Sequence, residues 1–499
     1  MKSHTKESRG LGISGKSFLT AVGILAVLMA GTYLLTLFVP AGSFERAMQD
    51  GKETILAGTY HRIEGGIPFW KWLLSPLLVL GSSQGGTLIA VILFLLILGG
   101  TSNILNRTGT MRYMLGKVVH ATGDRKYLLL VMVSLLFFSL GAFVGSTEEI
   151  VPMVPFAVAL SLAFGWDEMV GLGMSLGAVA CGFSTGVLNP FTTGVAQTFM
   201  GLPMFSGVSL RLLTYVVIYL ALLGFLISRA GKCEKRAACG RDSVHSEENS
   251  RKGKSGIPIL PPYASYMSAH PSGASQAFER DSRLEASVRF FAGTMLVCFG
   301  CIVLSAFLPG LSDFLLVLVA LFFLVIGVGC GICSGEGRRR VGSYFFFGII
   351  SLLPSVLLIL MAGSVQYTMT EAGILDTLLY WIVEAVEGLP VYGAVLCIFL
   401  FCMAINFFVS SGSAQAVLMM PLLAPLADLC GISRQLTVLA FLFGDGFSNL
   451  IYFTNPVLLI ALSLAGVSYG RWIRWSARLH VMIFALCCLI LMLGAAIGY

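Results

Sequence analysis

Long apolar stretches are the feature that most restricts the fold of this chain. Segments of roughly 20 predominantly apolar residues recur along it, and each is long enough to cross a bilayer core of about 30 Å. Hydrophobic residues make up 57% of the chain and charged residues only 11%, whereas a soluble domain has about 25% charged residues. We therefore expect an all-α polytopic membrane protein. Its clearest spans are 17–40, 87–106, 289–308, 313–333, 344–365 and 477–498.

The distribution of basic residues predicts the orientation of these spans. Lys and Arg are enriched in cytoplasmic loops, and here they cluster at the N-terminus and at 107–126, 338–340 and 471–478. All clusters fall on one side if 127–165 and 390–430 are hairpins that enter and leave the membrane on the same side. We expect a multi-pass protein of the bacterial inner membrane with a cytoplasmic N-terminus and an outer C-terminus. The net charge of +7 then reflects orientation, and no nucleic-acid partner is expected.

One long polar segment interrupts the apolar spans. Residues 230–288 are rich in Ser, Gly, Pro and charged residues, which is typical of a flexible linker, and their basic balance favours the cytoplasm. The twelve cysteines lie mostly in apolar segments, where cysteine usually packs as a small residue. Cys330 and Cys333 form a CxxC without a second pair, so we expect no metal or redox cofactor there.

Two parts of the chain match each other at a nearly constant separation. Matched Gly, Pro and Asn residues recur in the same order of spans, polar turns and Asn-Pro steps. The predicted topology starts one copy outside and the other inside, so we expect two inverted repeats. The matched pairs are Pro155/Pro421, Gly165/Gly431, Asn189/Asn455 and Pro190/Pro456, which share one offset, and Gly99/Gly363 and Gly109/Gly373, whose offset is slightly smaller.

The repeats divide the chain into five regions. Each repeat is expected to contain one re-entrant hairpin and one transmembrane helix that unwinds before an Asn-Pro step, because Pro lacks an N–H and disfavours helix in the residue before it. The regions are 1–86 (N-terminal tail, first span and outer loop), 87–229 (repeat 1, with hairpin 127–165 and broken span 169–200), 230–288 (linker), 289–343 (linking spans) and 344–499 (repeat 2, with hairpin 390–430 and broken span 434–465).

The hairpin tips and the two unwound segments are the predicted binding site. Irregular backbone at membrane depth needs protein or a wet cavity to satisfy its N–H and C=O groups, and inverted repeats place such segments near the midplane. An alternative is that the Ser, Thr and Gly residues only allow close helix packing. The candidate substrate-binding residues are Ser146, Thr147, Glu148, Glu149, Thr185, Asn189, Ser411, Gly412, Ser413, Gln415, Asn449 and Asn455. The candidate coupling-ion residues are Ser184, Asn189, Asp445, Ser448 and Thr454.

Three acidic residues fall at membrane depth. Glu148, Glu149 and Asp445 lie in a predicted hairpin tip and a broken span, and no Lys or Arg lies deep in any span. Charges inside a membrane are costly and usually functional. The site therefore needs a proton, a metal ion such as Na⁺ or a cationic substrate to balance it. Alternatively, Glu149 reaches the cytoplasmic water layer and is simply solvated.

Three segments carry a family resemblance. TEEIVPMVPFAVAL, STGVLNPFTTGVA and LMMPLLAPLADLCGISRQ resemble the YfcC-like branch of the ion-transporter superfamily, which is grouped with C4-dicarboxylate anaerobic carriers and arginine/ornithine antiporters. The resemblance implies a homodimer with elevator-type movement of a transport domain against a scaffold. Asp445 and the long linker depart from the pattern, which leaves the substrate open. Carried onto this chain, it implies hairpin tips at Gly145 to Glu149 and Ser410 to Gln415, and unwound segments at Ser184 to Asn189 and Ser448 to Asn455.

Three functions remain open. A carrier of small organic ions, most directly basic amino acids, would work by exchange or by Na⁺ or H⁺ coupling. Glu148 and Glu149 would offset the substrate's charge, Asn189 and Asn455 would bind its backbone-like groups, and Asp445 would bind the coupling ion. A C4-dicarboxylate or short-chain carboxylate carrier would rely on helix N-termini instead, and an ion channel is a third possibility. No HExxH motif is present, and we do not expect an enzyme.

Overall fold

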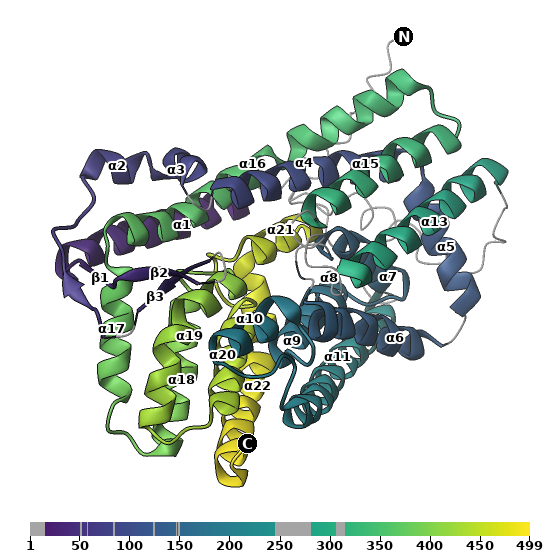
Figure 1. Cartoon of the computed structure of the whole chain (residues 1–499). Coiled ribbons are helices and arrows are strands. Elements are labelled where there is room, and N and C mark those ends of the chain that lie inside the picture. Colours follow the sequence, from purple (N-terminus) through teal and green to yellow (C-terminus); the bar gives the residue numbers. More distant parts are fainter. Residues whose placement is uncertain are drawn as a thin grey trace.

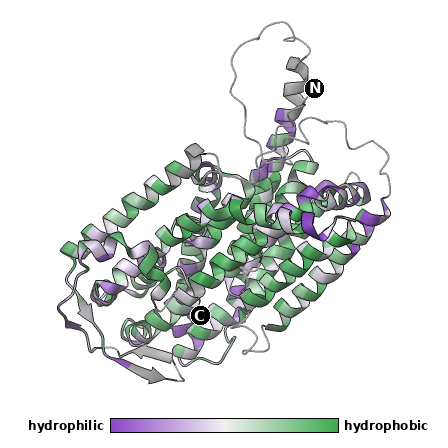
Figure 2. Ribbon diagram, turned by 90° about the horizontal axis from the view of Figure 1, so that it is seen from above, coloured by the Kyte–Doolittle hydropathy of each residue, from purple (hydrophilic) through white to green (hydrophobic). Residues whose placement is uncertain are grey.

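The fold is mainly helical. The structure is a computed structural model that describes residues 15–49, 52–56, 58–82, 85–122, 125–145, 147, 150–244, 281–305 and 315–499. Among these residues, eight helices are long and apolar enough to cross a membrane by length and composition. Figure 2 shows hydrophobic residues along most of the helices. The expected all-α polytopic fold class is confirmed.

The helices of the first repeat follow the predicted order. A span and a short amphipathic helix precede a hairpin, an interrupted helix and a final long span. These elements are α4 (Gly85–Arg107), α5 (Thr110–Thr122), α6 (Lys126–Ser139), η2 (Leu140–Val144), η3 (Val151–Met153), α7 (Val154–Ala163), α8 (Glu168–Leu172), η4 (Gly173–Gly177), α9 (Ala178–Thr185), η5 (Pro190–Gly194), α10 (Val195–Phe199) and α11 (Val208–Val244).

The second repeat has the same order of parts with fewer irregular turns. Its elements are α16 (Arg338–Glu371), α17 (Leu375–Val386), α18 (Val391–Asn406), α19 (Gly412–Leu429), α20 (Arg434–Ser448), α21 (Pro456–Ala465) and α22 (Tyr469–Ile497). Outside the repeats lie α1 (Gly15–Phe38), α2 (Phe69–Leu73), α3 (Ser75–Leu78), η1 (Val79–Gly81), α13 (Ser282–Ser305) and α15 (Leu315–Cys333).

The two repeats also share their helix-capping hydrogen bonds. Asp167 caps α8 by accepting a bond from Val170 N at 2.9 Å. Ser433, at the matching position of the second repeat, caps α20 by accepting from Leu436 N at 3.1 Å. A side-chain oxygen at this position satisfies an amide that the first helical turn leaves without a partner. The duplication read from the sequence therefore extends to the backbone, whereas the opposite orientation of the copies stays a prediction.

In each hairpin, the first and the last residues lie close together. Glu234 in α11 pairs with Lys126 at 2.7 Å, at the start of the first hairpin. It also accepts a hydrogen bond from Trp166 Nε1 at 2.9 Å, just after the hairpin ends. At the second hairpin, the Cys430 thiol after α19 lies 3.6 Å from the carbonyl of Val386, which precedes α18. Each hairpin therefore enters and leaves at one end of the molecule.

The helices form two layers. In Figure 1, α1, α4, α15 and α16 cross the upper part, and the hairpins, the interrupted helices, α11 and α22 fill the lower part. Within the upper layer, α16 packs against α1 and α4, and α15 packs against α4. In the lower layer, α9 contacts α6, α11 and α20, and α18 contacts α20. The two interrupted helices thus meet inside the lower layer.

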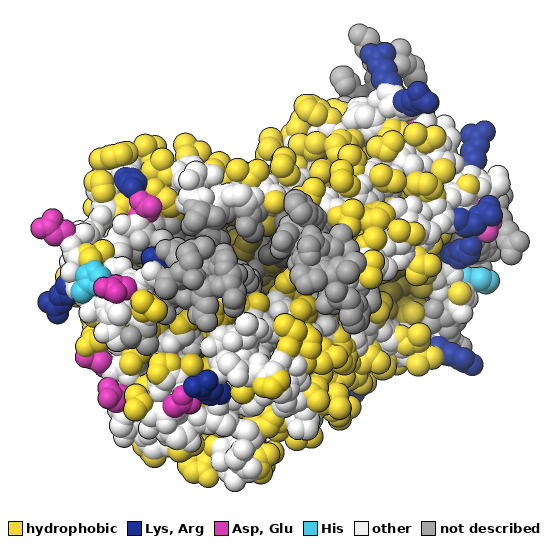
Figure 3. All heavy atoms as spheres, viewed as in Figure 1, with side chains coloured by type: hydrophobic (Ala, Val, Ile, Leu, Met, Phe, Trp, Pro, Cys, Tyr) yellow, Lys and Arg dark blue, Asp and Glu magenta, His cyan; other side chains and the backbone are white. Residues whose placement is uncertain are grey.

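Charged residues separate toward opposite ends of the helices. On the face in Figure 3, acidic side chains gather at the left edge, and several Lys and Arg side chains lie along the right edge. Among the described residues, each ion pair joins segments that the sequence assigns to the same side, as Arg471–Glu168 and Arg46–Asp376 do. The predicted grouping of loops therefore matches the contacts between them.

The first outer loop contains short strands that the sequence did not predict. The strands β1 (Gly42–Ser43) and β4 (His61–Arg62) pair antiparallel, as do β2 (Arg46–Gln49) and β3 (Lys52–Ile55). Asp376 in α17 anchors them by accepting a bond from the Phe44 amide at 3.1 Å and by pairing with the Arg46 guanidinium at 3.0 Å. The loop is thereby fixed to the junction of α16 and α17.

The segment predicted as a linker is shorter than expected. Helix α11 continues to Val244, and α13 already begins at Ser282, so both ends of 230–288 are helical. The helix continues past the membrane-length apolar part of α11 because its last turns contain good helix formers such as Lys, Glu, Arg and Ala. Residues 245–280, like the N-terminal residues 1–14, lie outside the described residues.

Candidate functional site

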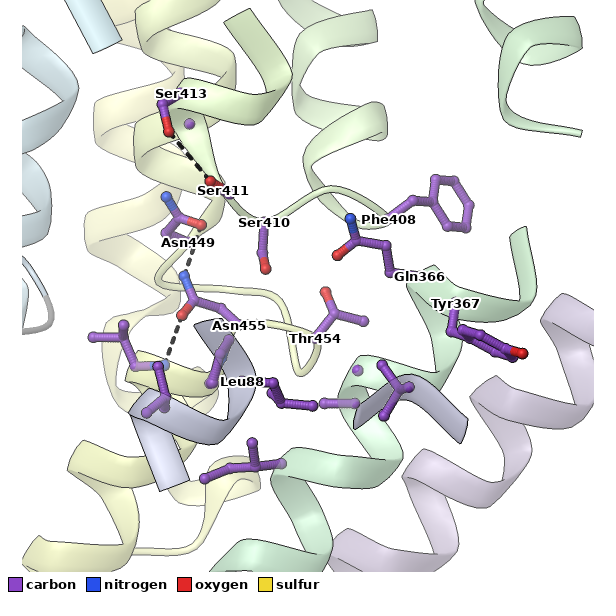
Figure 4. A pocket seen from close by; sticks show the side chains of 18 of the residues that line it. Leu88, Gln366, Tyr367, Phe408, Ser410, Ser411, Ser413, Asn449, Thr454 and Asn455 are labelled. Carbon is purple, nitrogen blue, oxygen red and sulfur yellow. Dashed lines mark hydrogen bonds between the residues drawn. The ribbon is translucent and has the colours of Figure 1, made fainter. Parts of the chain in front are cut away.

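A single cavity collects the segments that the sequence singled out. Its volume is about 640 Å³, and both hairpin tips and both helix interruptions contribute to its wall. Figure 4 shows the part of the wall from the second tip and the second interruption. The opposite wall comes from α4 and from the second half of α16. The polar groups on the wall are Ser82, Thr147, Thr192, Gln366, Tyr367, Thr370, Glu371, Ser410, Ser411, Ser413, Asn449, Thr454 and Asn455.

The first interruption is built by Gly186, Asn189 and Pro190. Gly186 ends α9 in a left-handed conformation with φ +51°, which glycine adopts readily. Asn189 is extended, and its Oδ1 accepts bonds from the amides of Phe191 and Thr192 at 2.9 and 3.2 Å. Pro190 has no N–H to satisfy, so it suits the first position of the new helix. The chain restarts its helix at membrane depth without losing these amide partners.

At the second interruption, the Asn side chain of the matching Asn-Pro step caps the new helix in the same way. Asn455 Oδ1 accepts a bond from Val457 N at 2.8 Å, just as Asn189 Oδ1 does from Phe191 N. The Asn455 amide nitrogen donates to Asn449 Oδ1 at 2.7 Å, a bond drawn in Figure 4. This second bond holds the two ends of the unwound stretch together at the cavity wall.

Asn406 was not among the residues predicted from the sequence. It is buried at the end of α18, and its amide nitrogen lies 2.7 Å from Ser448 Oγ, 2.9 Å from Asn449 Oδ1 and 2.9 Å from the carbonyl of Asp445. One amide therefore joins the second hairpin to the second interruption. The available signal was an amide side chain near the end of an apolar hairpin arm, four residues before the polar tip begins at Ser410.

The hairpin tips rest directly on the interrupted helices. Gly145 has φ +78°, and a Cβ there would overlap the Asn189 amide. Gly412 lies against Asp445 and Thr192, so a Cβ would meet the Asp445 carboxylate. Glycine at both tips lets the backbone approach this closely. Any displacement of a tip therefore changes the surroundings of the residue beneath it.

Asp445 is the most unusual buried group. It is fully buried in α20, and neither carboxylate oxygen has a hydrogen-bond partner among the described residues. A carboxylate without a partner is very costly in such surroundings, so the site favours a bound proton or cation. The nearby side chain of Thr192 also touches Gly412, and its hydroxyl likewise has no partner within the described part of the chain.

The predicted site residues divide into two groups. On the cavity wall are Thr147, Ser411, Gly412, Ser413, Asn449, Thr454 and Asn455. Behind the wall and fully buried are Ser184, Thr185, Asn189, Gln415, Asp445 and Ser448. The hydroxyls of Ser184, Thr185 and Ser448 bond to carbonyls one turn earlier in their own helices, which fits the packing alternative. Ser146, Glu148 and Glu149 lie outside the described residues.

The wall contributed by α16 was not predicted. Gln366, Tyr367, Thr370 and Glu371 line the cavity from the last turns of this helix, and Figure 4 shows Gln366 near Ser410, whereas the ring of Tyr367 points away from it. The span expected from the sequence, 344–365, ends before these residues, but α16 continues to Glu371. Hydropathy alone does not show how far a helix extends past its apolar window.

The fold and the cavity define the class of protein. A multi-pass helical protein with re-entrant hairpins and two unwound helices around a polar cavity has the architecture of a membrane transporter. Residues 18–496 match the family described as "DcuC: C4-dicarboxylate anaerobic carrier". The chain belongs to this family of membrane carriers.

Two curated relatives extend this result. The chain is 30% identical over 434 residues to the Escherichia coli K12 protein named "Putative basic amino acid antiporter YfcC", and the match covers 84% of this chain and 79% of that one. It is 26% identical to an uncharacterized protein of Haemophilus influenzae, over 85% of this chain and 78% of the relative. The resemblance read from the sequence motifs is thereby confirmed.

Two solved structures resemble the fold more distantly. The Alcanivorax borkumensis YdaH transporter gives a TM-score of 0.42 at 15% identity, covering 97% of this chain and 99% of that one. Neisseria gonorrhoeae MtrF, described as illuminating a class of antimetabolite efflux pumps, gives 0.40 at 16% identity with 94% of both chains covered.

Proposed function

We propose that this protein is a secondary active carrier of basic amino acids, and that the cavity between the hairpin tips and α16 is its substrate site. The observation that carries the proposal is the charge of the site. Among the described residues that line the cavity, Glu371 is the one charged side chain, and the buried Asp445 lies directly behind the tip at Gly412. A wall with an acid and no Lys or Arg favours a cationic solute. The name of the relative from E. coli agrees with this choice.

The hydroxyl and amide groups suit the amino-acid end of such a substrate. Ser411 and Ser413 stand at the start of α19, whose N-terminal amides carry partial positive charge and favour a carboxylate. Thr454 on the same wall has a hydroxyl without a partner among the described residues, and its oxygen can accept a hydrogen bond from an ammonium group. The positively charged group of the substrate's side chain would then lie near Glu371.

Transport would require the tips to move. We infer an elevator-type carrier, working as a homodimer in the bacterial inner membrane, in which the hairpins and interrupted helices travel against the layer that contains α4 and α16. Asp445 would bind the coupling ion, H⁺ or Na⁺. The tip residues Glu148 and Glu149, which the structure does not describe, remain candidates for offsetting the substrate's positive charge.

The test is exchange in proteoliposomes that contain the purified full chain. Vesicles loaded with unlabelled arginine should take up labelled arginine in a saturable way. Ornithine and lysine should compete, and succinate should not. Protein-free vesicles provide the baseline. Absence of exchange with arginine, ornithine and lysine would exclude the proposal, and sustained conductance without saturable exchange would indicate a channel.

A C4-dicarboxylate or short-chain carboxylate carrier is the second candidate. Two helices, α19 and α21, begin at the cavity, at Gly412 and at Pro456, and two helix N-termini are suited to two carboxylates. The description of the matched family favours the same substrate class. In the exchange experiment, uptake of labelled succinate that arginine does not inhibit would establish this second function instead.

A further inference from the structure

The acid on the cavity wall already has a cationic partner. Glu371, the last residue of α16, forms an ion pair with Lys71, and the two side chains are 35% and 34% exposed. Lys71 itself is not among the residues that line the cavity, whereas Glu371 and the neighbouring Tyr367 are. The pair therefore lies at the edge of the cavity, with Glu371 as part of the wall and Lys71 outside the set of lining residues.

Lys71 belongs to a fixed element. Its helix α2 is held by Trp72, whose indole N–H donates to the Met29 carbonyl of α1 at 3.0 Å and whose ring lies 4.9 Å from that of Tyr33. Upstream, the Gly66 amide donates to the carbonyl of Ala372, the residue after Glu371, at 3.3 Å. The backbone on both sides of Lys71 is thus fixed relative to α1 and α16. The hydrogen bond to Glu371 also raises the pKa of Lys71, so the lysine stays protonated.

We propose that Lys71 is a tethered cation that occupies Glu371 while the cavity is empty, and that a basic substrate displaces it. This inference rests on the proposed function and adds a specificity-determining pair to it. A partly exposed ion pair is weak enough to exchange one cation for another. A substrate ammonium or guanidinium group can replace the Lys71 ammonium at no net loss of pairing. A substrate without a cationic side chain would not displace Lys71 from Glu371.

The proposal predicts opposite effects for the two partners. Glu371→Gln removes the negative charge, and we expect the KM for arginine exchange to rise by about tenfold, because the substrate cation loses its charged partner on the wall. Lys71→Gln removes the competitor, and we expect the same KM to fall several-fold. Arg471→Gln, which removes a comparable ion pair with Glu168 away from the cavity, is the matched control and should leave KM unchanged.

A charge exchange completes the test. The double variant Lys71→Glu with Glu371→Lys can restore the ion pair while placing the cation on the wall, so its thermal stability should be near wild type and its arginine exchange should be lost. If the ion pair had only a structural role, the double variant would recover both thermal stability and arginine exchange. Melting temperatures of every variant show whether each is folded.

The outcomes separate the two hypotheses. A fall in KM for Lys71→Gln together with a rise for Glu371→Gln supports the tethered cation. If wild-type protein exchanges arginine but Lys71→Gln leaves the KM unchanged or raises it, the tethered cation is wrong and the proposed function stands. If wild-type protein exchanges no basic amino acid, both are wrong.

Discussion

Gly145 is the residue on which the first hairpin tip depends most directly. Its φ of +78° disfavours any residue with a side chain, and a Cβ would overlap the Asn189 amide. Gly145→Ala should therefore lower stability by more than the roughly 1–2 kcal/mol typical of a left-handed alanine and should reduce exchange. Melting temperature and exchange rate are the measurements.

Gly109 provides a matched control for this substitution. It has the same φ of +78°, but no atom lies within 4 Å of a Cβ built there. Gly109→Ala should lower stability only by the roughly 1–2 kcal/mol that a left-handed alanine costs, and it should leave exchange intact. Equal losses of stability and transport in the two variants would show that the tip contact with Asn189 has no part in function.

Asp445 gives a second prediction for a single residue. Asp445→Asn keeps the volume but removes the charge, so the buried site no longer needs a proton or cation. We expect gradient-driven accumulation of substrate to fall to the level without a gradient, while exchange across the membrane continues. Uptake with imposed H⁺ and Na⁺ gradients measures this.

Asp428→Asn is the control for that experiment. Asp428 is an exposed acid near the end of α19 that pairs with Arg434 at 2.6 Å. Its removal should leave the coupling unchanged. Accumulation by Asp445→Asn that still follows either gradient would eliminate Asp445 as the coupling residue.

At the scale of elements, the Asn-Pro steps predicted both helix interruptions. The sequence could locate them because Pro lacks an N–H and disfavours helix in the residue before it. It could not show that Asn189 would be used for capping and lie behind the wall, or that Asn406 would join the second hairpin to the second interruption. Such roles depend on contacts between helices far apart in the chain. Similarly, the apolar stretch of α16 did not show that the helix continues into polar turns, and these turns line the cavity.

The capping function of Asn455 can be separated from a binding function. Asn455→Ala removes the bond to Val457 N and the bond to Asn449 and should cost about 1 kcal/mol. Asn455→Ser keeps a capping oxygen, so it should recover most of the lost stability. If the amide also contacts substrate, the KM stays raised in both variants. Recovery of the wild-type KM in Asn455→Ser would leave capping as the only role of this residue.

At the scale of the molecule, the charge pattern predicted which loops lie together. The ion pairs follow the predicted sides, and both ends of the first hairpin meet at Glu234. The strands of the outer loop were not predictable, because they are very short and are held by Asp376 rather than by an alternating pattern. The direction of each repeat across the membrane rests on the positive-inside pattern and is open to a direct test.

Matched positions in the two repeats provide that test. Ala163 ends α7, and Leu429, its counterpart in the second repeat, ends α19. In a background without the native cysteines, a membrane-impermeant maleimide applied to intact cells should label Leu429→Cys and spare Ala163→Cys. Inside-out vesicles should show the reverse, since inverted repeats place matched turns on opposite faces. Arg339→Cys, in a basic cluster predicted to be cytoplasmic, should label together with Ala163→Cys. Labelling of Ala163→Cys and Leu429→Cys from the same side would mean that the repeats are parallel, and the symmetric site between the two hairpin tips would then need another explanation.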